Sequence, residues 1–335
     1  MHLGVLDQSP IPEGSTAGQA LRNSLELARW AEELGYGRYW VAEHHGTPAL
    51  ACASPEVLIG PIAAATSRIR VGSGGIMLPH YSPLKVAESF SMLSGMFPGR
   101  IDLGIGRAAG TSPNIAFALQ RDRRQRAPDD FREQLDELLE YFGDFRWSGP
   151  PFAGPQIYLL GSSLQSAIWA AELGLPYIFA DFINAHGSEI VDYYRERFRP
   201  SAYLDKPYVM VAAWAICAET DQEALRLSAS MRMMMTLMHR GRLIPVPTVE
   251  KAQQFLTQEG LSADTMPPGR RLITGTPGRV HKALEGLSRE YGGTDEILLV
   301  NIMYDHAARL RSYQLMAEFN TKGPLAVDSE AALSV

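Results

Sequence analysis

Cysteine and long apolar runs are both scarce in this sequence. The 335-residue chain has two cysteines, Cys52 and Cys217, which exclude a disulfide framework and a CxxC metal or redox motif. The longest strongly apolar run, near 209–218, is about half the length of a membrane span. The N-terminus lacks a basic region followed by an apolar stretch and a cleavage site. These absences predict a cytoplasmic protein that has no membrane partner.

Basic residues are fewer than acidic ones, so the net charge is −6 and the pI is about 5.8. The one dense basic run, 121–126, has acidic neighbours and is more typical of a solvated loop than of an anion site. Nucleic acid is therefore not an expected partner. The chain has no Gly-Lys pair and no GxSxG, which excludes a P-loop and argues against an α/β serine hydrolase. HExxH is absent as well, and no metal site is predicted.

Short apolar runs alternate with longer amphipathic ones along the whole chain. The short runs are rich in Val, Ile, Leu and Tyr and are bounded by Gly or polar residues, which is typical of strands. The predicted strands are Leu3–Asp7, Arg38–Ala42, Ile69–Ile76, Ile101–Ile105, Ile157–Leu160, Tyr177–Ala180, Tyr208–Cys217 and Ile297–Met303. A helical pattern follows each strand, and two of these helices begin with a Ser-Pro pair, a favourable N-cap followed by proline in the first turn.

These helices determine the predicted fold class. They are Ala17–Leu34, Pro55–Thr66, Pro83–Met96, Asp129–Phe142, Ser163–Leu173, Ser188–Phe198, Thr220–Met238 and Asp305–Phe319, with a further one at Pro277–Arg289. Continuous apolar strands separated by helices imply a parallel sheet that is covered on both faces. Eight such units predict an α/β fold of the (β/α)₈ TIM-barrel type, with a doubly wound open sheet as the alternative.

Two stretches interrupt the alternation. Arg107–Pro128 is polar and arginine-rich and is interpreted as an insertion after strand 4. Arg240–Arg271 is rich in Gly, Pro and Thr and is interpreted as an insertion in the strand 7–8 region. Residues 1–321 are predicted to form one barrel domain, and residues 322–335 a flexible tail.

The C-terminal ends of barrel strands open on one face, where active sites lie. Gln8 and Ser9 follow the first strand, and Glu43-His44-His45 follows the second. Neighbouring side chains on an extended segment point to opposite faces, so one of the two histidines, but not both, is expected to face this mouth. For the same reason they cannot easily grip one metal ion together. A buried, hydrogen-bonded histidine is the plain alternative.

Gly161-Ser162-Ser163 follows the fifth strand and opens a helix. Free backbone N–H groups and the helix dipole make such a place fit for an anion, although an ordinary N-cap fits equally well. Arg107 ends the fourth strand and could bind a phosphate with its guanidinium. The GxGxxxG pattern over 104–110 departs from the nicotinamide fingerprint and comes at the fourth unit, which disfavours a Rossmann site.

Taken together, these segments resemble the bacterial luciferase-like flavin-dependent monooxygenases, in particular a single-chain subgroup found in bacterial genomes and antibiotic pathways. The resemblance covers about residues 3–320 and lies in the order and spacing of several short motifs. The matching blocks are 40–45 (WVAEHH), 71–79 (VGSGGIMLP), Ala87-Glu88, 99–107 (GRIDLGIGR), 160–163 (LGSS), 169–176 (WAAELGLP) and 305–309 (DHAAR). The fold of this family is the (β/α)₈ barrel.

The resemblance implies an enzyme that uses reduced FMN (FMNH₂), supplied by a separate flavin reductase, and O₂ to oxygenate an organic small molecule. The flavin carries the chemistry as a C4a-hydroperoxide, and the protein orients it and excludes water. His44 matches the family histidine near the reacting oxygen, where it acts as an acid/base or stabilises the flavin intermediate. The expected flavin-binding residues are Ser9, Gly74, Gly75, Arg107, Gly161, Ser162, Ser163 and Ser166.

Further implications concern details of this site and its assembly. Gly74-Gly75 matches a place where the family often has a cis peptide bond beside the flavin ring. Arg240–Arg271 matches the mobile lid of luciferases, and a gating role is expected. Gly106 replaces the cysteine of luciferases proper, so light emission is not expected. The subgroup is taken to be homodimeric, and the helices Pro55–Thr66 and Pro83–Met96 are the expected interface.

Three other functions remain open at this stage. The same barrel could carry out hydride transfer with the deazaflavin F420, bind flavin without catalysis, or act as a nicotinamide reductase. The flavin retained by the protein and the consumption of oxygen discriminate these alternatives. Tyr81, Phe182 and Trp214 near the mouth suggest an apolar substrate, and they fit core packing nearly as well.

Overall fold

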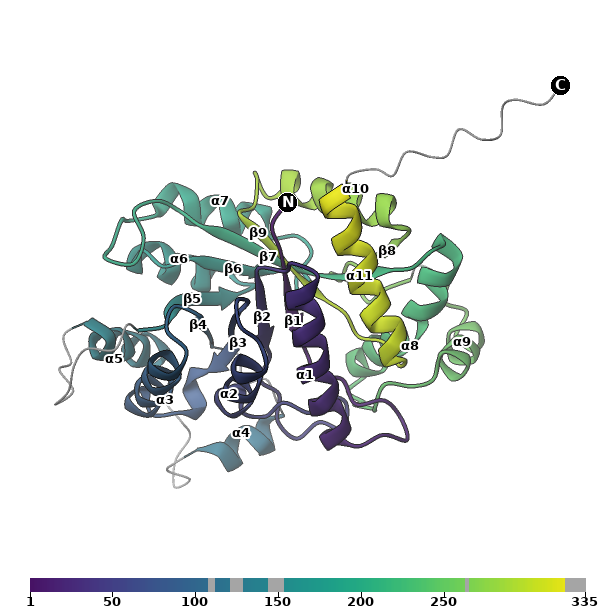
Figure 1. Ribbon diagram of the computed structural model, residues 1–335, viewed down its shortest axis with the longest axis horizontal. Coiled ribbons are helices and arrows are strands. Elements are labelled where there is room, and N and C mark those ends of the chain that lie inside the picture. The colour runs from purple at the N-terminus through teal and green to yellow at the C-terminus, as the bar shows by residue number, and fades with distance from the viewer. Residues whose placement is uncertain (108–111, 121–128, 144–153, 263–264, 323–335) are drawn as a thin grey trace.

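A closed parallel β-barrel surrounded by helices forms the centre of the protein (Figure 1). The computed structural model describes residues 1–107, 112–120, 129–143, 154–262 and 265–322. The strands are β1 (Leu3–Asp7), β2 (Arg38–Val41), β3 (Arg70–Met77), β4 (Ile101–Gly106), β5 (Gln156–Gly161), β6 (Tyr177–Ala180), β7 (Val209–Cys217), β8 (Ile273–Gly275) and β9 (Glu296–Val300). Strands β1 to β6 pair in sequence order, β6 pairs with β7, and β9 closes the ring between β7 and β1. The predicted (β/α)₈ TIM barrel is confirmed.

Helices surround this barrel, and most of them cover its outer face. They are α1 (Ala17–Glu33), α2 (Pro55–Ala65), η1 (Leu78–His80), α3 (Pro83–Met96), α4 (Pro113–Leu119), α5 (Phe131–Gly143), α6 (Leu164–Leu173), α7 (Ser188–Arg197), α8 (Asp221–His239), α9 (Val249–Gln258), α10 (Pro277–Glu290) and α11 (His306–Lys322). In Figure 1 the first and last long helices, α1 and α11, lie side by side. No helix in the described part of the chain is long and apolar enough to cross a membrane.

Local sequence signals explain where these helices begin and end. The side chains of Thr16 and Thr220 cap α1 and α8 by accepting hydrogen bonds from backbone N–H groups three residues on. Gly174 ends α6 in the left-handed conformation at φ 61°. Ser54 and Ser82 occupy the N-cap positions predicted from their Ser-Pro pairs, but neither side chain makes a capping hydrogen bond.

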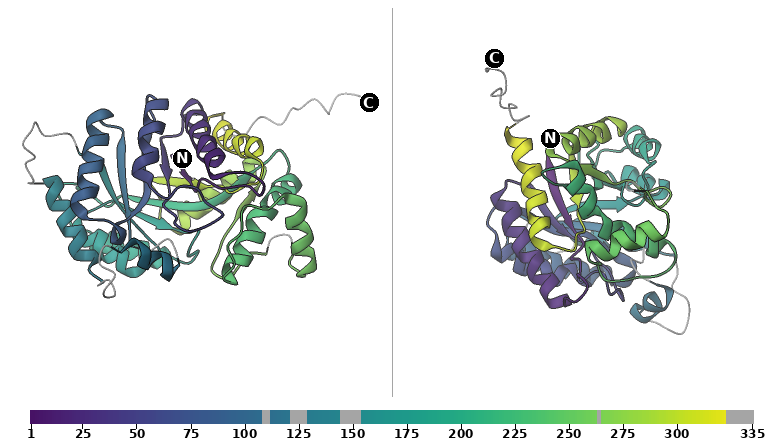
Figure 2. Two further views of the ribbon diagram at one scale, coloured as in Figure 1. Left: turned by 90° about the horizontal axis from the view of Figure 1, so that it is seen from below. Right: turned by 90° about the vertical axis from the view of Figure 1, so that its right-hand side faces the viewer.

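The two interrupting stretches contain elements that the sequence analysis did not predict. The seven-residue helix α4 lies in the insertion after strand 4, of which 108–111 and 121–128, with the basic run 121–126, lie outside the described residues. Helix α9 lies in the second insertion and packs against α8, and Figure 2 shows this pair at one end of the molecule. The three-residue β8 pairs only with the end of β7, outside the closed ring. Residues 323–335 of the predicted tail are likewise outside the described part, and Lys322 is the last residue of α11.

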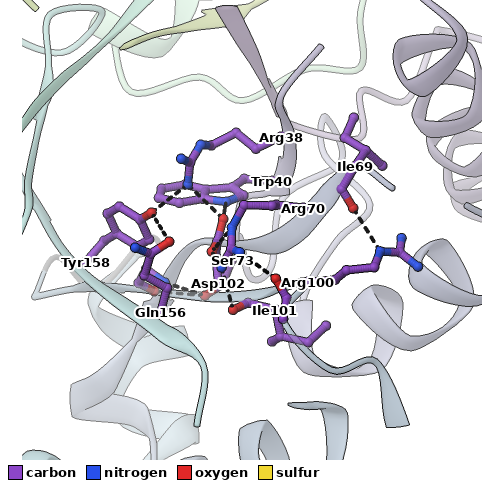
Figure 3. Close-up of polar contacts among 12 residues, drawn as sticks. Arg38, Trp40, Ile69, Arg70, Ser73, Arg100, Ile101, Asp102, Gln156 and Tyr158 are labelled. Carbon is purple, nitrogen blue, oxygen red and sulfur yellow. Dashed lines mark hydrogen bonds and ion pairs between the residues drawn. The ribbon is translucent and has the colours of Figure 1, made fainter. Parts of the chain in front are cut away.

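The N-terminal end of the barrel is closed by a buried ionic network (Figure 3). Asp102 on β4 is fully buried and accepts from Arg38 on β2 at 2.8 Å and from Arg70 Nε on β3 at 2.9 Å. Trp40 Nε1 donates to the same carboxylate at 2.9 Å, and Arg38 also pairs with Glu296 at 2.8 Å. These charges fill this end of the barrel, and a surface cavity of about 550 Å³, lined in part by Arg38, Arg70 and Glu296, lies beside them.

Candidate functional site

A cavity of about 380 Å³ lies at the C-terminal ends of the barrel strands. Most residues along its wall are small, apolar or hydroxyl-bearing, and they are joined by one glutamine, one histidine and one arginine. Eight of the nine predicted site residues line it: His44, Gly74, Gly75, Arg107, Gly161, Ser162, Ser163 and Ser166. The fold therefore brings together residues from the ends of β2, β3, β4 and β5, as expected of a TIM-barrel site.

Ser9 is the predicted residue that the structure does not place on this wall. It is fully buried, and its backbone N–H donates to Asp7 Oδ1 at 2.8 Å. Its hydroxyl lies 2.8 Å from that of Ser24 on α1. Its backbone turns at φ 47°, and the preceding residue, Gln8, lines the cavity instead. A contact between Ser9 and a ligand stays a prediction.

One end of the cavity carries free donors for an anion. Ser162 and Ser163 lie at the start of α6, and the N-cap side chain of Ser163 makes no capping hydrogen bond. The exposed Arg107 guanidinium stacks over the ring of Trp169 at 5.6 Å. Within the described residues no carboxylate forms an ion pair with Arg107. A helix N-terminus, two hydroxyls and an arginine are suited to a phosphate group.

Ser166 lines the same end, but its hydroxyl is already engaged. It donates to the carbonyl of Ser163 at 2.7 Å and lies 2.9 Å from the hydroxyl of Tyr177. Gly161 lies against it, since a Cβ there would come within 2.1 Å of Ser166 Oγ. Ser166 therefore fixes the turn into α6, and its direct contact with a ligand stays a prediction.

The Gly74–Gly75 peptide bond on the cavity wall is cis, as the resemblance implied. The pairing of β3 with β4 shifts in register between Gly74 and Ile76. A Cβ on Gly75 would lie 2.7 Å from the carbonyl oxygen of Gly104. A side chain at this position would therefore collide with the neighbouring strand.

His44 lies where this cavity meets a second one. Burial lowers its pKa from 6.5 to about 4, the nearby His45 acts in the same direction, and the backbone of Ala42 acts against both. The imidazole is therefore neutral near pH 7. Its Nδ1 is buried and has no hydrogen-bond partner among the described residues. An unpartnered buried ring nitrogen on a cavity wall is available to a ligand.

We expected only one of His44 and His45 to face the mouth of the barrel. Only His44 lines the first cavity, as expected, but both histidines line the second. His45 lines the second cavity together with His44, while its Nε2 lies 2.6 Å from Glu43 Oε1. Strand β2 ends at Val41, so the histidines follow it on an irregular segment. Strict alternation of side chains applies only to extended backbone.

The second cavity has a volume of about 480 Å³ and is more apolar than the first. Gln8, His44, Phe182 and Ile183 line both cavities. The wall of the second also includes Trp214 and, from α8 and the second insertion, Met234, Met235, Met238, Leu243, Ile244 and Arg270. The sequence analysis placed Phe182 and Trp214 near the mouth, but it missed the residues from α8 and the second insertion, although the methionine-dense helix was a signal. Tyr81, which the sequence analysis also placed near the mouth, packs against the hydrophobic core between the strands and the surrounding helices.

Known proteins resemble the chain over nearly its whole length. A family model described as luciferase-like monooxygenase matches residues 1–295. A luciferase-like monooxygenase of Escherichia coli K12 is 41% identical over 93% of this chain and 94% of its own. An N-acetyl-S-alkylcysteine monooxygenase of Bacillus subtilis is 37% identical over 95% of this chain and 98% of its own.

Solved structures agree with these sequence matches. Apo-MsnO8 superposes with a TM-score of 0.87 at 39% identity, covering 96% of this chain and 98% of its own. An FMN complex of a Pseudomonas putida diketocamphane monooxygenase (TM-score 0.72, 21% identity, 95% and 97% covered) shares the fold. So does an F420-dependent secondary alcohol dehydrogenase (TM-score 0.62, 16% identity, 93% and 97% covered). The chain belongs to the luciferase-like monooxygenase family.

Proposed function

We propose that this protein is an FMNH₂- and O₂-dependent monooxygenase acting on an organic small molecule. The observation that carries the proposal is the pair of adjoining cavities, with anion donors at one end and the neutral His44 at their junction. Reduced flavin in the first cavity would supply two electrons, so that one oxygen atom enters the substrate and the other leaves as water. The second cavity would hold the substrate.

The protein's own residues have separate tasks in this scheme. Arg107, Ser162 and Ser163 would hold the phosphate, and the backbone of Gly74 and Gly75 on the cavity wall would lie beside the flavin ring. His44 can accept or hold a proton at the unpartnered Nδ1 where the two cavities meet. The apolar wall formed by residues such as Phe182 and Trp214 excludes water from that junction.

Rapid mixing of the reduced-FMN complex with oxygenated buffer tests the reaction. We expect a transient absorbance distinct from those of reduced and oxidised FMN, with oxidation kinetics that differ from those of free FMN. Oxidation at the rate of free FMN without a transient would contradict the proposal. F420 would then be the next ligand to test, with hydride transfer and no oxygen consumption as its signature.

The phosphate end favours FMN over F420, because FMN ends in a phosphate monoester and F420 carries its phosphate within a longer side chain. Replacing Arg107 by glutamine removes the cation that lines this cavity together with Ser162 and Ser163. We expect the variant to bind reduced FMN about 10- to 100-fold more weakly, the usual effect of losing a charged hydrogen bond. Riboflavin, which lacks the phosphate, should bind as to the wild type. Anaerobic calorimetry measures both ligands.

The exposed Arg22→Gln variant on α1 is the control for this charge change. Equal losses for FMN and riboflavin, or none for either, would contradict the assignment of the phosphate to Arg107. The proposal also includes a separate reductase as the source of FMNH₂, because the GxGxxxG pattern over 104–110 departs from the fingerprint of a nicotinamide site.

We further propose a homodimer that forms through α2 and α3. These neighbouring helices leave apolar side chains in solvent: Val57 is 69% exposed, Met92 64% and Met96 59%. Replacing Met92 by glutamate places a charge in this patch and is expected to give monomers in light scattering. Tyr203→Glu, at an exposed apolar site elsewhere, is the control. A wild-type monomer, or a variant that remains dimeric, would contradict the proposed interface.

A further inference from the structure

Arg270 brings a positive charge into the wall of the apolar second cavity. The residue is half-buried, and its Nη1 donates to the carbonyl oxygen of Phe182 at 2.7 Å. Its guanidinium stacks over the ring of Trp214, with 5.6 Å between Cζ and the ring centroid. These contacts hold the group in place, and within the described part of the chain most of its five N–H donors have no acceptor.

No carboxylate in the described part of the chain pairs with Arg270. The adjacent Arg271 pairs with Glu290 at 2.6 Å and with Asp181 at 3.2 Å. The fully buried Arg309 pairs with Asp7 at 2.6 Å. Burial lowers the pKa of Arg270, with no neighbouring charge to offset it, although a guanidinium remains protonated at any ordinary pH. The chain thus neutralises these two arginines, whereas Arg270 has no carboxylate partner among the described residues and can pair with a ligand.

Trp214 adds a second unused donor on the same wall. It is 3% exposed and lines the second cavity, and its Nε1 has no hydrogen-bond partner among the described residues. A buried donor without a partner is uncommon, and it costs about 1–3 kcal/mol when nothing replaces its lost water. Because the Trp214 ring and the Arg270 guanidinium are stacked, both donors belong to one region of the wall.

The rest of the cavity wall determines the chemistry of the part of the ligand that does not contact Arg270 or Trp214. The described residues that line the cavity include no Asp or Glu, so no negative charge competes for the guanidinium. Its apolar side is formed by Leu50, Met234, Met235, Met238, Ile244 and Ile302. Flexible methionines accommodate apolar groups of varied shape. A volume of about 480 Å³ lies within the usual range for small-molecule sites.

We infer that the second cavity binds small molecules with an apolar body and one carboxylate, which Arg270 and Trp214 Nε1 hold. The carboxylate pairs with the guanidinium, and the apolar body extends along the methionines toward His44 at the junction. This inference rests on the proposed function only in naming these molecules as substrates. The binding itself requires no flavin, so the two can fail separately.

Calorimetry on the flavin-free protein tests the inference with matched pairs of acid and amide. The probes are octanoate with octanamide and phenylbutanoate with phenylbutanamide, which have the same body with and without the charge. We expect the acids to bind the wild type about 10-fold or more tightly than their amides. Arg270→Gln should weaken acid binding by about 10- to 100-fold and leave amide binding unchanged. Unchanged amide binding also shows that the variant is folded.

Two further variants complete the test. Arg242→Gln removes the same charge from an exposed position of the same segment, outside both cavities, and should leave the acid preference intact. Arg270→Lys keeps the positive charge but loses the planar guanidinium, so this variant should retain part of the preference for acids over amides. A panel in which no acid binds more tightly than its amide, including one in which nothing binds, overturns the inference. An acid preference that depends on Arg270 supports it even if mixing with oxygen gives no transient.

Discussion

Replacing His44 by glutamine is expected to shorten the lifetime of the oxygen-dependent transient by about 100-fold or more, with hydrogen peroxide released instead. A positioned proton-transfer group contributes about 10²- to 10⁴-fold to a reaction. His44 lies at the junction of the two cavities with an unpartnered Nδ1, so it can hold or exchange a proton there. A glutamine amide can hydrogen-bond at the same place but cannot exchange a proton at neutral pH. Rapid-mixing absorbance and a peroxide assay measure both effects.

The control for this variant is His239→Gln, which changes an exposed histidine at the end of α8. It should leave the transient and the peroxide yield unchanged. A His44→Gln protein with a lifetime close to that of the wild type would show that proton handling lies elsewhere. FMN affinity should be nearly equal in the two variants, because neither touches the phosphate end.

The same histidine makes stability depend on pH in a defined window. In the unfolded chain His44 titrates near 6.5, and burial lowers its pKa to about 4 in the folded protein. As pH falls from 6.5 toward 4, the unfolded state takes up a proton that the folded state does not. The free energy of unfolding therefore decreases over this window through His44. Urea titrations should show this part of the decrease in the wild type and its absence in His44→Gln.

The sequence predicted the barrel because its strands have a strong and simple signature. A strand such as β7, Val209–Cys217, is buried along its whole length and therefore reads as one apolar run. Helix α9 carried a weaker signal: Val249, Ala252 and Leu256 are buried with helical spacing, but the surrounding segment is rich in Gly, Pro and Thr. β8 has three residues, too few for any period to be recognised.

The sequence predicted the position of a residue best where that position follows from a strand end. Arg107 directly follows β4 and Ser162 directly follows β5, so the barrel topology alone brings them together. Arg270 comes from a long excursion between β7 and β8, and its contact with Trp214 depends on how that segment folds back. Ser9 does follow the end of β1, as the sequence predicted, but its left-handed backbone conformation directs its N–H toward Asp7 instead of the cavity. Backbone conformation at a single residue is not readable from a strand pattern.

The largest effect on stability is expected at the opposite end of the barrel, in Asp102→Ala. The carboxylate is fully buried and accepts from Arg38, Arg70 and Trp40 (Figure 3). Removing it leaves these donors without their acceptor and two arginine charges poorly compensated, since Glu296 alone remains beside Arg38. Removing one partner of a buried ion pair costs about 3–5 kcal/mol. Urea denaturation should therefore show a much lower midpoint for this variant.

Glu88→Ala provides the matched comparison, because Glu88 pairs with Lys85 at 3.1 Å on the surface. Exposed pairs contribute about 0–1 kcal/mol, so its midpoint should stay close to that of the wild type. A similar small shift for Asp102→Ala would mean that water or rearranged side chains replace the buried carboxylate. Because the network lies at the N-terminal end and the proposed flavin site is the cavity at the C-terminal end, the folded fraction of Asp102→Ala should bind FMN with wild-type affinity. In that case the N-terminal ends of the strands would determine the stability of the barrel, and their C-terminal ends would determine ligand binding.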